Sequence, residues 1–175
     1  FGPENLNLPP AEIRQRVDMA LARVGLAGLN ERDPHTLSAG EKARLAVASL
    51  LAMQPWCLVL DELTAMLDPI SRASMLGLLG GLHAEGMTVV VVTHHMSEVA
   101  LAERVIVLQE GQVALEGSPP EVFQSEEQLR ALGLALPPAA AIAHGLARRG
   151  LDVPQTIVCP EDLVTRLAML ARVAR

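Results

Sequence analysis

Apolar residues recur along the chain in two patterns, helical spacing and continuous runs. Ile13, Val17, Leu21 and Val24 are separated by four, four and three positions, which predicts an amphipathic helix that Gly25 ends. The ten residues at the start of the chain contain three prolines, and we expect them to form an extended or turn segment. The N-terminal part of the chain is therefore expected to be helical after this first segment.

Two short apolar runs, residues 57–60 and 88–92, predict strands that are fully buried. Between them, Asp68 and Pro69 supply an N-cap and a first-turn proline for a helix that should end near Gly86. This order of strand, helix and strand predicts a right-handed parallel βαβ core, and hence an α/β fold.

After this core the pattern predicts a short helix, two strands and a helical tail. The expected helix covers residues 97–102, the strands 104–108 and 113–115, and the tail helices lie near 119–133, 138–149 and 160–174. A turn at residues 110–112 should join the two strands. The chain thus divides into three predicted sections, 1–54, 55–118 and 119–175.

Composition agrees with a core of this kind and narrows the class of partner. Half of the 175 residues are hydrophobic and only three are aromatic, so the core is built from aliphatic residues, which suits helices packed on a parallel sheet. The net charge of −6 argues against nucleic acid as the main partner.

Cys57 and Cys159 are too far apart in sequence to form a motif that binds a metal ion. No run of about 18 apolar residues occurs.

The basic residues exclude one phosphate-binding motif. Thirteen of the fourteen are arginines, and Lys42 is the only lysine. A P-loop needs a Gly-Lys-Ser/Thr triplet, but Lys42 lies between Glu41 and Ala43. The sequence therefore contains no Walker A motif.

Two adjacent acids, Asp61 and Glu62, follow the first predicted strand. Ligands of open α/β sheets gather at the carboxyl ends of strands, where one acid can hold Mg²⁺ and the other can orient or deprotonate a water molecule. The alternative interpretation is that the pair only caps the next helix.

A helix is expected to begin at Ser38 and to run to about Met53, because Ser38 and Glu41 have the spacing of a capping box. The free amides at such a helix start, near Ala39 and Gly40, can bind an anion. An ordinary capping box is the alternative interpretation.

His94 lies at the end of the second predicted strand. It could bind a ligand there, or it could be a histidine at a strand end whose hydrogen bonds are satisfied within the protein. A metal pair with His95 is not expected, because adjacent strand residues face opposite ways.

Taken in order, these segments resemble the C-terminal part of an ATP-binding-cassette (ABC) ATPase. The resemblance consists of a signature sequence at residues 37–41, a Walker B sequence at 58–62, a D-loop at 65–68 and a switch histidine at 93–94. The separations between Ser38 and Asp61 (61 − 38 = 23) and between Asp61 and His94 (94 − 61 = 33) are also those of the family.

The flanking sequences are similar to those of energy-coupling factor (ECF) transporter ATPases, a group that includes cobalt and nickel uptake ATPases. These flanks are residues 1–5, 66–69, 93–96 and 116–119, with a tail at 132–154. The resemblance implies a partial P-loop NTPase fold with a mostly parallel sheet. Residues 1–54 would be a partial helical signature subdomain, 55–118 part of the ATPase core, and 119–175 a C-terminal helical extension.

The resemblance further implies that two ATPase subunits, like or unlike, meet head to tail around ATP and Mg²⁺. Asp61 would hold Mg²⁺, Glu62 would be the general base, and His94 would contact the γ-phosphate. Asp68 would link the two sites across the interface.

In such a dimer, the signature residues would serve the nucleotide held by the partner subunit. Ser38 and Gly40 would bind its γ-phosphate, with Ala39 and Glu41 in the same segment. Ala39 and Glu41 stand where the family usually has Gly and Gln, and Leu63 stands where it usually has Pro.

The expected whole protein is an ATP-hydrolysing subunit that powers uptake of vitamins or of cobalt or nickel ions. It would sit peripherally on the cytoplasmic face of a bacterial or archaeal cell membrane. A transmembrane coupling subunit would bind near residues 1–35, and a separate membrane subunit would bind the substrate.

Without a Walker A motif, this chain is expected to be a truncated form that is inactive alone. Two alternatives stay open. One is an interaction module without a P-loop that completes a partner's ATPase site, and the other is a soluble ABC ATPase with no transport role.

Overall fold

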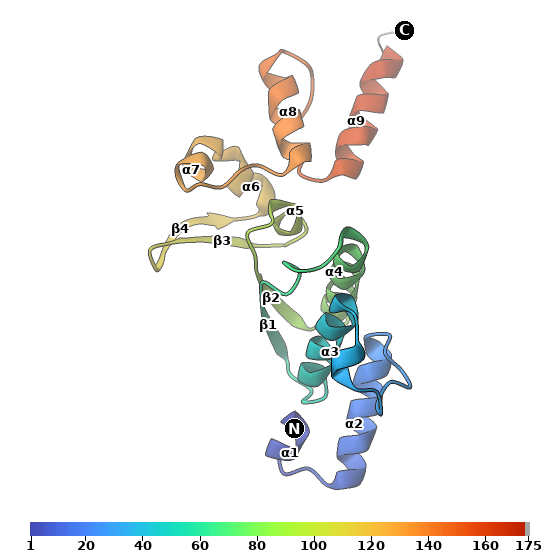
Figure 1. Ribbon diagram of the computed structural model, residues 1–175. Coiled ribbons are helices and arrows are strands. Elements are labelled where there is room, and N and C mark those ends of the chain that lie inside the picture. The colour runs from blue at the N-terminus through green and yellow to red at the C-terminus, as the bar shows by residue number, and fades with distance from the viewer. Residues whose placement is uncertain (174–175) are drawn as a thin grey trace. The chain divides into compact units, whose positions relative to one another are not determined.

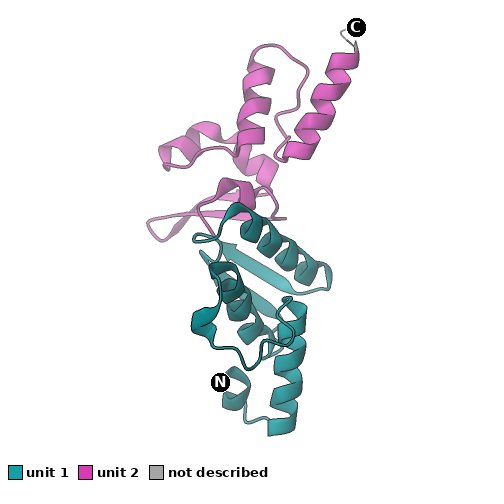
Figure 2. Ribbon diagram, turned by 45° about the vertical axis from the view of Figure 1, so that its right-hand side comes forward, with its two compact units in different colours: residues 1–92 teal, residues 93–175 magenta. Residues whose placement is uncertain are grey.

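The computed structural model describes residues 1–173, which form two compact units (Figure 2). The first unit covers residues 1–92, and the second begins at Thr93. Each unit has its own apolar core and is described separately below. The division into three sections at residues 54 and 118 stays a prediction.

The first unit contains a helical part and a βαβ part. Its elements are α1 (Gly2–Asn5), α2 (Pro10–Arg23), η1 (Pro34–Thr36), α3 (Ala39–Leu51), β1 (Cys57–Asp61), α4 (Pro69–Ala84) and β2 (Thr88–Val92). The predicted helices near residues 13–24, 38–53 and 68–86 are confirmed. The expectation that residues 1–10 form an extended or turn segment is wrong for Gly2–Asn5, which form the one-turn helix α1. Pro3 is compatible with it, since a first-turn residue needs no amide donor.

Strands β1 and β2 pair in parallel, with Cys57 opposite Thr88 and Asp61 opposite Val92. Helix α4 connects them, and α3 and α4 lie on the same side of the pair (Figure 1). Leu58 and Leu60 point into the core between the strands and these helices. The predicted parallel βαβ arrangement is confirmed.

The prediction that both strands are fully buried is wrong, because they are covered on one face only within this unit. Burial alternates along β1 and β2, as the pleat requires. The side chains of Val59, Val90 and Val92 are 64%, 43% and 49% exposed. We call these three residues the open sheet face.

The ends of the helices in this unit are set by local residues that the sequence pattern identified. Ser38 and Glu41 form both hydrogen bonds of a capping box at the start of α3. Asp68 caps α4 by accepting hydrogen bonds from the amides of Ile70 and Ser71. Gly25, which follows α2, has a φ of 75°, a conformation that costs a glycine little.

The second unit begins with a short helix and a hairpin and continues as a helical tail. Its elements are α5 (Met96–Val99), β3 (Val105–Gln109), β4 (Gln112–Gly117), α6 (Pro119–Gln124), α7 (Glu126–Ala131), α8 (Pro138–Arg148) and α9 (Pro160–Val173). Strands β3 and β4 are antiparallel, with Glu110 and Gly111 at the turn in left-handed conformations. The predicted hairpin and the predicted helices at 138–149 and 160–174 are confirmed, although residue 174 lies outside the described residues.

The single helix expected over residues 119–133 is instead two helices. Ser125, with φ −82° and ψ 45°, leaves the helical conformation and lies between α6 and α7. This break lets Phe123 and Leu129 both point into one core with the inner face of the hairpin. Tertiary packing therefore divides a segment whose pattern alone predicts continuity.

No helix among residues 1–173 is both long enough and apolar enough for a membrane span.

Candidate functional site

The chain bends sharply at Glu62, directly after β1. Asp61 is the last residue of the strand, and the amide of Glu62 donates a hydrogen bond to the carbonyl of Val92 at the end of β2 (2.9 Å). Glu62 has a φ of 49°, a left-handed conformation that is uncommon for a residue with a side chain. The side chain of Asp61 is exposed and that of Glu62 is half-buried, so the two carboxylates differ in environment.

Two backbone hydrogen bonds fix the turn that follows. The amide of Ala65 donates to the carbonyl of Glu62 (3.1 Å), and the amide of Leu67 donates to the carbonyl of Thr64 (3.1 Å). The segment around Leu63 is therefore an ordered turn, although leucine replaces the proline expected from the family resemblance. It leads directly to Asp68 at the start of α4.

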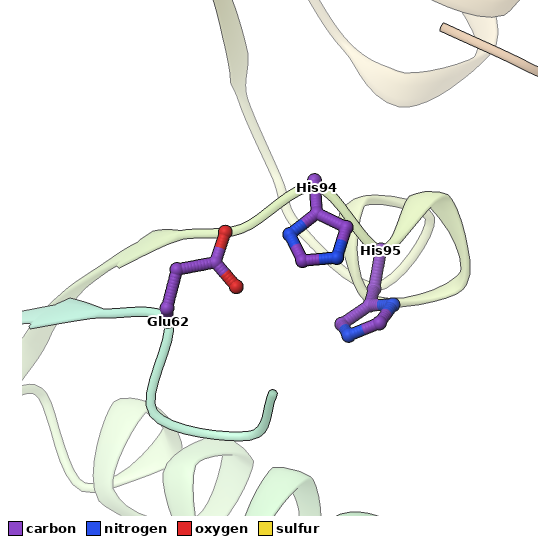
Figure 3. Close-up of side chains that lie close together, drawn as sticks. All are labelled: Glu62, His94 and His95. Atoms are coloured by element: carbon purple, nitrogen blue, oxygen red, sulfur yellow. The ribbon is translucent and has the colours of Figure 1, made fainter. Parts of the chain in front are cut away.

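The histidines at the start of the second unit lie next to one another (Figure 3). The hydroxyl of Thr93 accepts a hydrogen bond from the amide of His95 (3.0 Å), which bends the chain at His94. The ring centroids of His94 and His95 are 4.3 Å apart and the rings are tilted by 37°. The expectation that these side chains face opposite ways is wrong, because β2 ends at Val92 and both histidines lie beyond the pleated strand.

The start of α3 combines a capping box with free amides. The hydroxyl of Ser38 accepts a hydrogen bond from the amide of Glu41 (3.3 Å), and the carboxylate of Glu41 accepts one from the amide of Ser38 (2.8 Å). The bond from the Ser38 amide, followed by that with its hydroxyl, holds the pKa of Glu41 below its ordinary value. By helix geometry, the amides of Ala39 and Gly40 have no acceptor within the helix. They are suited to bind a phosphate oxygen.

The start of α4 lies beside the start of α3. The carboxylate of Asp68 accepts hydrogen bonds from the amides of Ile70 and Ser71, both at 3.0 Å. The hydroxyl and then the amide of Ser71 hold the pKa of Asp68 below its ordinary value. The side chain of Ser71 also packs against Gly40.

The structure therefore brings together two of the predicted groups, Gly40 of α3 and Asp68 of α4, through Ser71. Sequence reasoning missed Ser71. The signal that could have found it is the pattern Asp-Pro-Ile-Ser, in which a serine three positions after the N-cap can bond back to the capping carboxylate.

The side chains and amides described above provide some of the groups that bind a nucleotide and its magnesium ion. Asp61 offers an exposed carboxylate at the carboxyl end of a parallel strand, which is the kind of oxygen ligand that Mg²⁺ prefers. Glu62 follows it and could accept a proton from water. The amides of α3 suit a phosphate group, whereas the sequence has no Gly-Lys-Ser/Thr triplet to cradle one.

Comparison with known sequences shows which proteins this chain is similar to. A family described as ABC transporter matches residues 3–65. The energy-coupling factor transporter ATP-binding protein EcfA1 of Symbiobacterium thermophilum is 52% identical over 171 residues, which cover 97% of this chain and 60% of that protein. The protein EcfA of Methanosarcina acetivorans is 47% identical over 154 residues, 88% of this chain and 56% of its own length. This chain spans about 60% of the length of these relatives.

Solved structures agree with the sequence comparison. The protein cbiO1 of Clostridium perfringens, described as part of the ABC transporter complex cbiONQ, is 43% identical with a TM-score of 0.64, covering 75% of this chain and 53% of that one. The dimeric bacterial ABC transporter cassette MJ0796 is 32% identical with a TM-score of 0.55, covering 64% of this chain and 49% of that one. The described elements form a partial ABC ATPase fold, and the chain is homologous to energy-coupling factor transporter ATP-binding proteins over 97% of its length.

Proposed function

We propose that this chain forms part of an ATP-hydrolysing subunit of an energy-coupling factor transporter, which powers uptake of vitamins or of cobalt or nickel ions. The observation that carries the proposal is the pair Asp61 and Glu62 at the carboxyl end of β1, next to the end of β2. Homology to ECF ATP-binding proteins over 97% of the chain supports the same function.

The chemistry assigned to this pair follows from its two environments. Asp61 holds Mg²⁺, which neutralises charge on the phosphates. Glu62 orients and deprotonates the attacking water, with its carboxylate set by the left-handed bend. His94 contacts the γ-phosphate and helps to hold it in place.

The start of α3 acts on a nucleotide held by a second ATPase subunit, of the same or a different kind. Ser38 and the amides of Ala39 and Gly40 bind its γ-phosphate, while Glu41 stays in the capping box. Asp68 links the two composite sites across the head-to-tail interface. A Walker A motif must come from outside these 175 residues, so in isolation they bind ATP weakly and do not turn it over.

The assembled protein binds a transmembrane coupling subunit through the helical segment near residues 1–35, at the cytoplasmic face of the membrane. A separate membrane subunit selects the substrate.

The test is a Glu62→Gln substitution in a chimaera in which a Walker A-containing segment of an ECF ATPase precedes this chain. Loss of the carboxylate should abolish ATP turnover, because the amide cannot accept the proton, while ATP-driven dimerisation persists. Glu110→Gln, on the hairpin turn of β3 and β4, is the matched control and should retain turnover. Full turnover in Glu62→Gln would overturn the role of Glu62.

A further inference from the structure

The first turns of α3 and α4 are in contact because residue 40 has no side chain. A Cβ atom placed on Gly40 would lie 2.8 Å from Oγ and 3.2 Å from Cβ of Ser71. Both separations are shorter than ordinary van der Waals contact between such atoms. The glycine therefore permits a helix-to-helix approach that any other residue would disturb.

The side chain of Ser71 is held on its other side by Asp68. Its amide donates a hydrogen bond to Oδ1 of the Asp68 carboxylate at 3.0 Å, and hydrogen bonding by its hydroxyl is the largest cause that holds the pKa of Asp68 below its ordinary value. The hydroxyl that a Cβ on residue 40 would meet is therefore the same hydroxyl that lowers the pKa of Asp68. Ser71 joins the N-cap of α4 to the first turn of α3.

A second contact one turn further fixes the same pair of helices. Arg44 of α3 donates through Nη2 to the hydroxyl of Ser74 on α4 (2.6 Å) and through Nη1 to the carbonyl of Val24 (3.1 Å). The contacts of Gly40 with Ser71 and of Arg44 with Ser74 lie on successive turns of both helices. The two helix starts are thus held in one orientation.

We propose that Ser71 is a positioning residue that couples Asp68 to the phosphate-binding turn at Gly40, so that the D-loop and the signature segment move as one body. A phosphate that displaces the start of α3 would then displace Asp68 with it. Binding of a phosphate to the signature segment in one composite site is in this way communicated to Asp68, which faces the other composite site. This consequence rests on the proposed function, whereas the contact itself requires no nucleotide.

The packing is tested by a double-mutant cycle on the 175-residue chain, with urea unfolding as the measurement and no nucleotide present. Gly40→Ala should lower the equilibrium constant for folding by about tenfold, because the methyl group overpacks the contact. Gly77→Ala on α4 is the matched control, since a Cβ there meets nothing within 4 Å. That change should raise the constant by about threefold, as expected for glycine to alanine in an open helix.

In a Ser71→Gly background, Gly40→Ala should lose its penalty and behave like Gly77→Ala. If Gly40→Ala lowers the folding constant equally in both backgrounds, Ser71 is not its neighbour and the proposal is overturned. Failure of the ATPase assignment leaves this cycle unaffected, so the two hypotheses fail separately.

The positioning role is tested by titrating the Asp68 carboxyl by NMR in the same chain. Ser71→Ala, which removes only the hydroxyl, should raise the pKa of Asp68 because that hydrogen bond is lost. Gly40→Ala should raise the pKa as well, since the added methyl displaces the hydroxyl, whereas Gly77→Ala should leave it unchanged. A merely structural contact predicts lower stability in Gly40→Ala with an unaltered Asp68 titration, and that result would overturn the coupling.

Discussion

At the scale of single residues, Glu62 is both the proposed general base and a residue with a strained backbone conformation. A residue with a Cβ in the left-handed region costs roughly 1–2 kcal/mol relative to ordinary conformations. Such strain persists only where surrounding contacts enforce it, as the hydrogen bond from the Glu62 amide to Val92 does here. The bend takes the side chain of Glu62 out of the alternation of side chains between the two faces of β1.

Comparison of Glu62→Gly with Glu62→Ala isolates this backbone strain, because both variants lack the carboxylate. Glycine tolerates a φ of 49° and alanine does not, so Glu62→Gly should be the more stable variant by about 1 kcal/mol. Urea unfolding measures the difference.

The same pair of substitutions at Glu85 is the control. Glu85 follows α4 with a φ of −80°, where glycine has no conformational advantage. Glu85→Gly should therefore be no more stable than Glu85→Ala. Equal stability of the two Glu62 variants would contradict a strained bend.

Residue types and spacing predicted the acids and the caps but not their conformations. Asp61, Glu62, Ser38 and Asp68 were identifiable because each follows or precedes a periodic segment. The left-handed φ of Glu62 carries no such mark, since that conformation usually signals glycine or asparagine. The contact between Gly40 and Ser71 depends on how two distant helices pack, which local pattern does not encode.

At the scale of elements, predictions held where local residues set the boundaries. Helices α3 and α4 begin at Ala39 and Pro69 as their caps predict. The division of α6 from α7 was missed because Ser125 resembles an ordinary helix residue, and packing of the tail decides the break.

One carboxylate, Glu126 at the start of α7, joins three side chains of the helical tail. Its oxygens lie 2.7 Å from Nη1 of Arg148, 3.0 Å from Nη2 of Arg130 and 3.4 Å from Nδ1 of His144. The bond with Arg148 contributes most to holding the pKa of Glu126 below its ordinary value. His144 is buried, and its Nε2 lies 3.0 Å from the carbonyl of Gln155.

Glu126→Gln should destabilise the chain at neutral pH and have little effect in acid. A carboxylate with a lowered pKa in the folded state stabilises the fold above its unfolded pKa of about 4.3, and this contribution is lost as pH falls through the folded value. Urea unfolding from pH 7 to pH 3 should show the difference between wild type and variant shrink.

Glu127→Gln, at the neighbouring and exposed carboxylate, is the control and should follow the wild-type pH dependence. A difference between Glu126→Gln and wild type that stays constant with pH would show that the side chain acts through packing instead of charge.

At the scale of the molecule, the order of motifs predicted the family although no single motif did. An acid pair after a strand, a capping box and a strand-terminal histidine are each common. Their occurrence in this order indicated the resemblance, and the homology to ECF ATP-binding proteins confirms that recognition. Full burial of the strands was predicted wrongly. Continuous apolar runs are typical of strands in a sheet that is covered on both faces, whereas within the first unit only one face of these strands is covered.

The open sheet face of Val59, Val90 and Val92 should make the 175-residue chain self-associate. Parallel strands are normally covered on both faces, and an uncovered aliphatic surface favours contact with a second apolar surface. Sedimentation velocity at increasing concentration should show association, and Val59→Thr with Val90→Thr should weaken it, since threonine keeps β-propensity but lowers hydrophobicity. Val164→Thr on α9 is the control, since this valine is about as exposed as Val59, and the variant should associate like wild type. A wild-type chain that stays monomeric at all concentrations would contradict this prediction. Covering the open sheet face would then stabilise a dimer too little to hold two copies of the chain together.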